Sequence, residues 1–154
     1  MNKQKLRKNY MKQLKFTYFI AAFAVLLSGV TIYTFFRNIN NMFLFQFIQK
    51  PFFLDLLHKT VKTESLWLNM FIYNLPYGLW CLSGLLLIRS IWLSNEKWRA
   101  IYSGLFITII MSYVILKLPG IIPGTFDVLD IFFMSLFAFV ESITFYFFIK
   151  RRIY

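Results

Sequence analysis

Two carboxylates, Asp127 and Asp130, stand three residues apart at the start of a long apolar run, in a chain with six acidic residues. Residues at this spacing project from the same face of a helix. Two neighbouring carboxylates can bind a cation, hold a basic group or share a proton. Asp127, or Thr125 just before it, can also cap the helix that follows. A salt bridge from Lys117 to one carboxylate is a further alternative.

A second group of polar and aromatic residues lies in the stretch "YNLPYGLW". Asn74 and Tyr77 can donate and accept hydrogen bonds, and Trp80 offers a flat apolar face. Such residues at a membrane surface can bind a lipid headgroup, a sugar or a peptide. We predict five ligand-binding residues from the two stretches: Asp127, Asp130, Asn74, Tyr77 and Trp80.

A third pair of charges lies deeper in the apolar runs. Glu141 is near the middle of the last run, where a lone carboxylate costs a few kcal/mol. Arg89 has a long side chain and lies towards the end of another run, so we predict an intramembrane ion pair between them. In the alternative, Arg89 extends to the surface and Glu141 stays neutral.

The sequence offers no catalytic set, phosphate-binding loop or metal-ligand spacing. It has one His and one Cys, which excludes a disulfide within the chain and disfavours a Cys/His metal site. We therefore predict no metal and no cofactor, and we favour a protein that is not an enzyme. The net charge of +11 comes from basic residues at the ends of apolar runs. That pattern indicates membrane topology and no nucleic-acid partner.

Long apolar runs must position these residues, and they define the fold class. The chain is 59% hydrophobic and 15% charged, whereas soluble domains have about a quarter charged residues. A helix needs about 20 apolar residues to cross the hydrocarbon core. We predict an all-α polytopic membrane protein, a single domain over residues 1–154. Its four-helix bundle has spans at 16–36, 75–94, 100–116 and 131–149.

The second span has two possible limits because Pro76 interrupts the apolar run Leu66–Ser94. Proline is tolerated at the start of a helix but not in its interior. We therefore start this span near Leu75, with Asn74 as its cap, and place the residues before it in the membrane interface. A single kinked helix over Leu66–Arg89 is the alternative.

Four spans divide the basic residues unevenly between two sides. Twelve of the 17 lie before span one, near the turn between spans two and three, or after span four. Cytoplasmic segments carry such an excess, so both termini are predicted in the cytoplasm. We expect the membrane to be the plasma membrane of a bacterial cell. The Phe-rich segment 40–65 then faces outward, either as interfacial helical pieces or as a structured loop packed on the bundle.

The stretch "PGTFDVLDI" resembles the C-terminal signature of VanZ-like membrane proteins, in which a turn precedes Phe-Asp, two residues and a second Asp. Gly124, Phe126, Asp127 and Asp130 match this pattern, and Thr125 replaces the family's arginine. The upstream "NLPYGLW" is similar to a divergent branch of the same family. The resemblance implies a small multi-helix membrane protein, linked in some members to tolerance of glycopeptide antibiotics.

Together these patterns favour one function over two others. We expect a non-enzymatic integral membrane protein that binds a lipid-linked or envelope-associated molecule at its outer face, with membrane lipids as its surroundings. The first alternative is a small membrane enzyme that acts on lipid headgroups through Asp127 and Asp130. The second is an accessory subunit that binds a membrane-protein partner through its Phe-rich surface.

Overall fold

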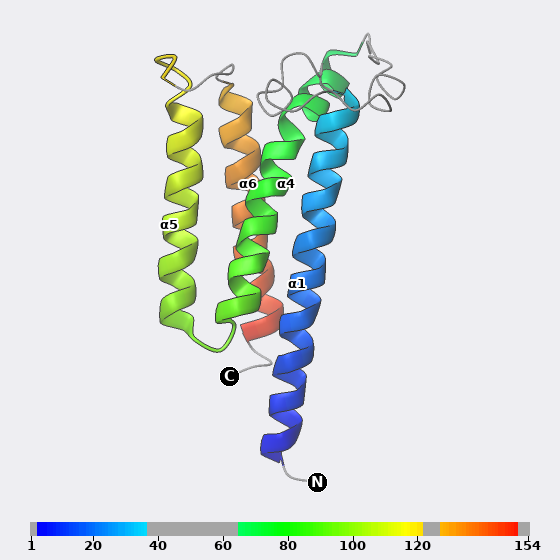
Figure 1. Ribbon diagram of the computed structural model, residues 1–154, viewed down its shortest axis with the longest axis vertical. Helices are drawn as coiled ribbons and strands as arrows, with labels where there is room; N and C mark the ends of the chain where they lie inside the picture. Colours follow the sequence, from blue (N-terminus) through cyan, green and yellow to red (C-terminus); the bar gives the residue numbers. More distant parts are fainter. Residues whose placement is uncertain (1–2, 37–64, 122–126, 151–154) are drawn as a thin grey trace, which may run out of the picture.

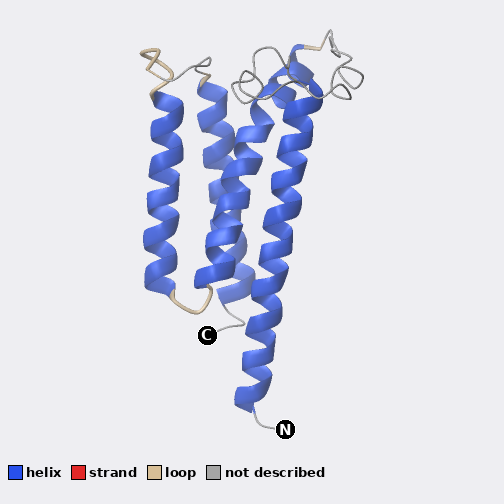
Figure 2. Cartoon of the chain, in the orientation of Figure 1, coloured by secondary structure: helices blue, strands red, loops and turns tan. Residues whose placement is uncertain are grey.

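The computed structural model describes residues 3–36, 65–121 and 127–150 of the chain, and these are almost entirely helical (Figure 1, Figure 2). The helices are α1 (Lys3–Phe36), α4 (Leu66–Trp92), α5 (Glu96–Ile115) and α6 (Val128–Thr144). A π-helical segment, η2 (Phe145–Lys150), continues α6. The described residues contain no strand, which confirms the all-α prediction for this part of the chain. Residues 40–64 of the predicted interfacial segment lie outside the described residues.

Four helices are long and apolar enough to cross a membrane, as the sequence predicts. They comprise Arg7–Phe36, Trp67–Trp92, Glu96–Ile115 and Val128–Phe147 within the described chain. Their outward faces carry large apolar side chains, among them Phe23 of α1 and Ile109 of α5. A bundle that leaves so much apolar surface uncovered has the composition of a protein surrounded by lipid.

Helix α4 is the centre of the bundle, because it packs against α1, α5 and α6 (Figure 1). The apolar core between α4, α5 and α6 is formed by Cys81, Leu85, Val114 and Met134. Helices α5 and α6 make only slight contact with each other. The position of α4 therefore sets the positions of the other three.

The start of α4 differs from the prediction that span two begins near Leu75 with Asn74 as its cap. The helix begins at Leu66 with Ser65 in the N-cap position, and it continues through the buried Pro76. The Asn74 side chain donates instead to the Met70 carbonyl, 2.9 Å away, within the same helix. Neighbouring helices and side-chain hydrogen bonds allow proline inside such a packed helix. The helix therefore begins where the alternative, a single kinked helix over Leu66–Arg89, places its start, and it continues past Arg89 to Trp92.

Close packing around α4 depends on two glycines that leave room for aromatic rings. A Cβ on Gly84 would overlap the ring of Phe106 from α5. A Cβ on Gly78 would lie 2.5 Å from the ring of Phe137 from α6, closer than such contacts occur. Small residues at these positions let helices approach where apolar burial alone cannot drive association. The two rings therefore determine where α5 and α6 lie along the axis of α4.

Helix α1 is much longer than a bilayer crossing requires. Its 34 residues span about 51 Å at about 1.5 Å per residue, whereas the hydrocarbon core is about 30 Å thick. The N-terminal end of α1 projects past the ends of the other helices (Figure 1). The N-terminal part of α1 carries the exposed basic residues Arg7, Lys8 and Lys12.

Candidate functional site

Polar side chains gather at the end of the bundle where α4 and α6 begin and α5 ends, the upper end in Figure 1. We call Asn74, Tyr77, Lys117, Asp127 and Asp130 the upper cluster. Three of them are buried, since Asn74 is 3%, Lys117 5% and Asp130 1% exposed. Buried ionisable groups are costly in a membrane protein and usually face polar partners or a functional site.

Lys117 lies just beyond α5 and reaches across to α4. Its ammonium donates a hydrogen bond of 2.8 Å to the hydroxyl of Tyr77. The same nitrogen lies 4.5 Å from the ring centroid of Tyr77 and 5.1 Å from that of Tyr113 on α5. Two aromatic faces and one hydroxyl therefore hold the ammonium. The ion pairs among the described residues do not include the salt bridge from Lys117 to Asp127 or Asp130 that the sequence offered as an alternative.

The two carboxylates take different places at the start of α6. Asp127 is the N-cap, and its Oδ1 accepts a hydrogen bond of 2.9 Å from the Leu129 backbone N–H. Asp130 lies in the first turn and its side chain is almost fully buried. The capping role expected for Asp127 is thus present, and the positive end of the helix dipole favours both negative charges.

Asn74 and Trp80 do not form an open recognition surface in the structure. Asn74 is turned towards the Met70 carbonyl of its own helix. Trp80 packs against α1, with its ring centroid 5.2 Å from that of Tyr33. A Cβ on Gly29 would lie 2.8 Å from the indole nitrogen, so Gly29 makes the space for this ring. Of the five predicted ligand-binding residues, these two have clear packing roles.

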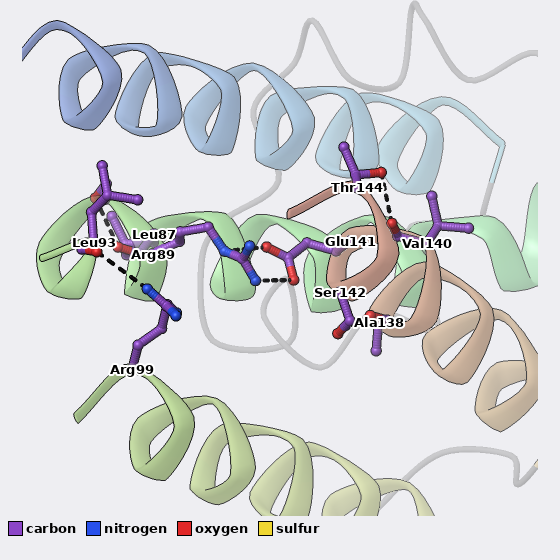
Figure 3. A network of polar contacts seen from close by, with 10 residues as sticks. Leu87, Arg89, Leu93, Arg99, Ala138, Val140, Glu141, Ser142 and Thr144 are labelled. Atoms are coloured by element: carbon purple, nitrogen blue, oxygen red, sulfur yellow. Dashed lines mark hydrogen bonds and ion pairs between the residues drawn. The ribbon is translucent and has the colours of Figure 1, made fainter. Parts of the chain in front are cut away.

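Arg89 of α4 and Glu141 of α6 face each other across the interior, as the sequence predicts (Figure 3). Arg89 Nη2 lies 2.6 Å from Glu141 Oε2, and Nε lies 2.5 Å from Oε1. Both side chains are buried, at 8% and 5% exposure. The first contact is a charge-assisted hydrogen bond, and the second is a close ion-pair contact that is not a hydrogen bond. This pair joins α4 to α6 towards the lower end of the bundle.

A second buried arginine and one aromatic ring complete this arrangement. The guanidinium carbons of Arg89 and Arg99 lie 3.8 Å and 4.2 Å from the ring centroid of Phe145, the first residue of η2. Cations over an aromatic face are stabilised most when they are desolvated. We call Arg89, Arg99, Glu141 and Phe145 the lower cluster. It brings together α4, α5 and the end of α6.

The last turn of α4 receives cations from two other helices. Arg99 Nη1 donates to the Leu93 carbonyl at 3.2 Å (Figure 3), and Lys15 of α1 donates to the Ile91 carbonyl at 3.3 Å. Helix C-termini have unpaired carbonyls and carry partial negative charge. Lys15 and Arg99 therefore cap α4, which gives the lower cluster a structural role.

The sequence did not indicate three of these roles. In the sequence Arg99 is one of several basic residues near the turn between two apolar runs, and Phe145 is one of 20 phenylalanines with no distinguishing neighbour. Lys117 and Tyr77 are 40 positions apart in the sequence, so no local sequence pattern indicates that they are in contact. Among the residues that the structure describes, no group of three or more His, Cys, Asp or Glu could hold a metal ion.

The fold and the two clusters define the class of protein to which this part of the chain corresponds. It is all-helical, it has four helices long and apolar enough to cross a membrane, and its buried polar clusters lie towards opposite ends of the bundle. Comparisons with protein-family models, with curated proteins and with solved structures find no match.

Proposed function

We propose that this protein crosses a bacterial plasma membrane four times and binds the polar part of a lipid-linked or envelope-associated molecule at its outer face, without catalysing a reaction. The resemblance of "PGTFDVLDI" to VanZ-like proteins supports a place in the cell envelope. It also suggests a link to glycopeptide tolerance. Gly124 and Phe126 of this signature lie outside the described residues.

The observation that carries the proposal is the burial of Lys117 and Asp130, groups of opposite charge, in the upper cluster. Ionisable groups are costly to bury. In the lower cluster Arg89 and Glu141 offset that cost by pairing with each other, whereas the contacts of Lys117 within the described residues are with uncharged groups. Polar headgroups carry charges and hydrogen-bonding groups that such residues complement. Tyr77 adds a hydroxyl to the same cluster.

The orientation rests on the distribution of charge. The N-terminal end of α1, the turn between α4 and α5 and the end of η2 lie together at the lower end (Figure 1). Twelve of the 17 basic residues belong to these segments and the residues next to them. This bias supports a cytoplasmic lower end, with the upper cluster at the outer face.

Cysteine labelling tests the orientation. Val128→Cys at the exposed start of α6 and Lys97→Cys at the exposed start of α5 are matched reporters at opposite ends, in a Cys81→Ala background. A membrane-impermeant maleimide should label intact cells at position 128 and not at 97. Labelling at 97 alone would place the upper cluster in the cytoplasm and refute the outer-face proposal.

Binding is tested by native mass spectrometry of the protein after mild detergent extraction. The wild-type protein should retain a defined polar lipid, and the isosteric variant Asp130→Asn should lose it while staying folded. Glu96→Gln removes an exposed carboxylate at the opposite end and is the control that should retain the lipid. Identical retained lipids in all three proteins, in the proportions of the bulk membrane, would contradict the proposal.

A further inference from the structure

The ammonium of Lys117 is the feature of the upper cluster that goes furthest in defining a ligand. A lysine near the end of a membrane helix ordinarily extends its charge into water. Here the side chain turns inward and is almost fully buried against Tyr77 and Tyr113. Its place just beyond the C-terminal end of α5 favours a positive charge at this point.

The contacts of this ammonium hold it in place without neutralising it. Its partners in the described residues are the Tyr77 hydroxyl and the faces of two tyrosine rings, which are uncharged. An ammonium has three N–H donors, and the hydroxyl takes one of them. The ion pairs Arg89–Glu141 and Arg99–Glu96 lie in the other half of the bundle. Lys117 thus carries a positive charge that no ion pair within the described residues neutralises, and the Tyr77 hydroxyl uses only one of its three N–H donors.

The neighbouring carboxylate of Asp127 has its own stabilising partner. It accepts the Leu129 N–H and lies at the positive end of α6. Asp130 is in the first turn of the same helix, where the dipole also favours negative charge. The charge of Lys117 is therefore left for a ligand group of opposite sign.

We propose that Lys117, positioned by Tyr77 and Tyr113, binds the phosphate of an anionic headgroup. This inference rests on the proposed function, since it names the headgroup class bound at the same site. A phosphate group offers several acceptor oxygens and full negative charge, and charge-assisted hydrogen bonds of this kind are among the strongest in proteins. The phosphate can belong to a lipid or to a soluble phosphate monoester.

Nanodiscs with defined lipids test the proposal. Purified protein is incorporated with phosphatidylglycerol, which carries a phosphate, or with a neutral galactosyl diglyceride, and retained lipid is counted by native mass spectrometry. Wild-type protein should prefer phosphatidylglycerol, and Lys117→Gln should weaken its retention about tenfold. Lys117→Arg, which keeps the charge, should retain most of the preference. Glycerol phosphate in solution is the arm that tests a soluble source.

Lys97→Gln is the matched control, because it removes the same charge from an exposed position at the other end of α5. Equal losses in Lys97→Gln and Lys117→Gln would show general attraction to anionic lipid and overturn the proposal. If Lys117→Gln does not fold, Tyr77→Phe removes only the hydroxyl that positions the ammonium, and it should reduce the preference several-fold. An unchanged preference in a folded Lys117→Gln or Tyr77→Phe protein would also overturn it.

The same experiment separates this proposal from the more general one. Retention of galactosyl diglyceride that depends on Asp130 but not on Lys117 would leave headgroup binding intact and reject the phosphate assignment. Equal retention of both lipids at bulk proportions, in wild type and Asp130→Asn alike, would reject the proposed function itself. Binding of glycerol phosphate that is lost in Lys117→Gln would support the phosphate assignment and identify a soluble ligand.

Discussion

Replacement of Glu141 by glutamine should strongly destabilise the bundle. The carboxylate makes two contacts with Arg89, at 2.5 Å and 2.6 Å, and both side chains are buried. Removing one partner of a buried pair leaves an uncompensated charge and costs about 3–5 kcal/mol. Here the cost falls at the upper end of that range, because Arg89 and Arg99 both lie against Phe145 and their main buried counter-charge is gone.

Arg89→Gln should cost less than Glu141→Gln. After this replacement Arg99 and Glu141 remain in the lower cluster as one positive and one negative group. The charge of Arg99 acts on Glu141, so the carboxylate is still partly compensated. The double variant should be more stable than the sum of the two single effects predicts. Unfolding by SDS in mixed micelles, followed by the fluorescence of the four tryptophans, measures the free energies.

The double-mutant cycle should give a coupling free energy of at least about 1 kcal/mol, above the average of about 0.6 kcal/mol for polar contacts in a membrane protein. Glu96→Gln is the control. Its carboxylate is exposed and lies 3.9 Å from Arg99, so its loss should cost less than about 1 kcal/mol. A coupling within about 0.5 kcal/mol of zero means that the two effects are additive, and the pair then does not hold α4 to α6.

Three further predictions concern single positions. Gly84→Ala places a methyl group against the Phe106 ring and should lower the free energy of unfolding by about 1–3 kcal/mol in the same SDS titration. Gly104→Ala is the control on the open face of α5, and it should be neutral or stabilising by up to about 1 kcal/mol. Asp127→Ala removes the cap of α6 and should cost about 1 kcal/mol, most of which Asp127→Asn should keep. Phe145→Leu removes the ring that both guanidiniums contact, and it should cost more than Phe147→Leu, whose ring is exposed. Equal costs would exclude a cation–π contribution.

The helical class and the Arg89–Glu141 contact could be predicted because each follows from one strong constraint. Apolar runs of about 20 residues permit few structures other than helices. A buried carboxylate is stabilised by a cation, and few cations are deep enough in the apolar runs to reach Glu141. Both constraints act on the sequence before any detail of packing is known.

The beginning of α4 and the directions of individual side chains could not be predicted in the same way. A proline marks a helix start only when nothing else supports the backbone, and the packed neighbours of Pro76 give that support. Asn74 has a partner one turn away in its own helix, which competes with any ligand. Lys117 could extend to water or turn inward, and the packing of α5 on α4 decides between them.

The dependence of every helix on α4 has a mechanical consequence. α5 has the least extensive contact with α4 of the three helices packed on it, and it scarcely meets α6. If the protein were pulled out of a bilayer by a force on the α5 segment, α5 should leave first while α1, α4 and α6 stay assembled. The upper cluster would then separate at Lys117, because this residue comes from the helix that departs and Tyr77 from the one that stays.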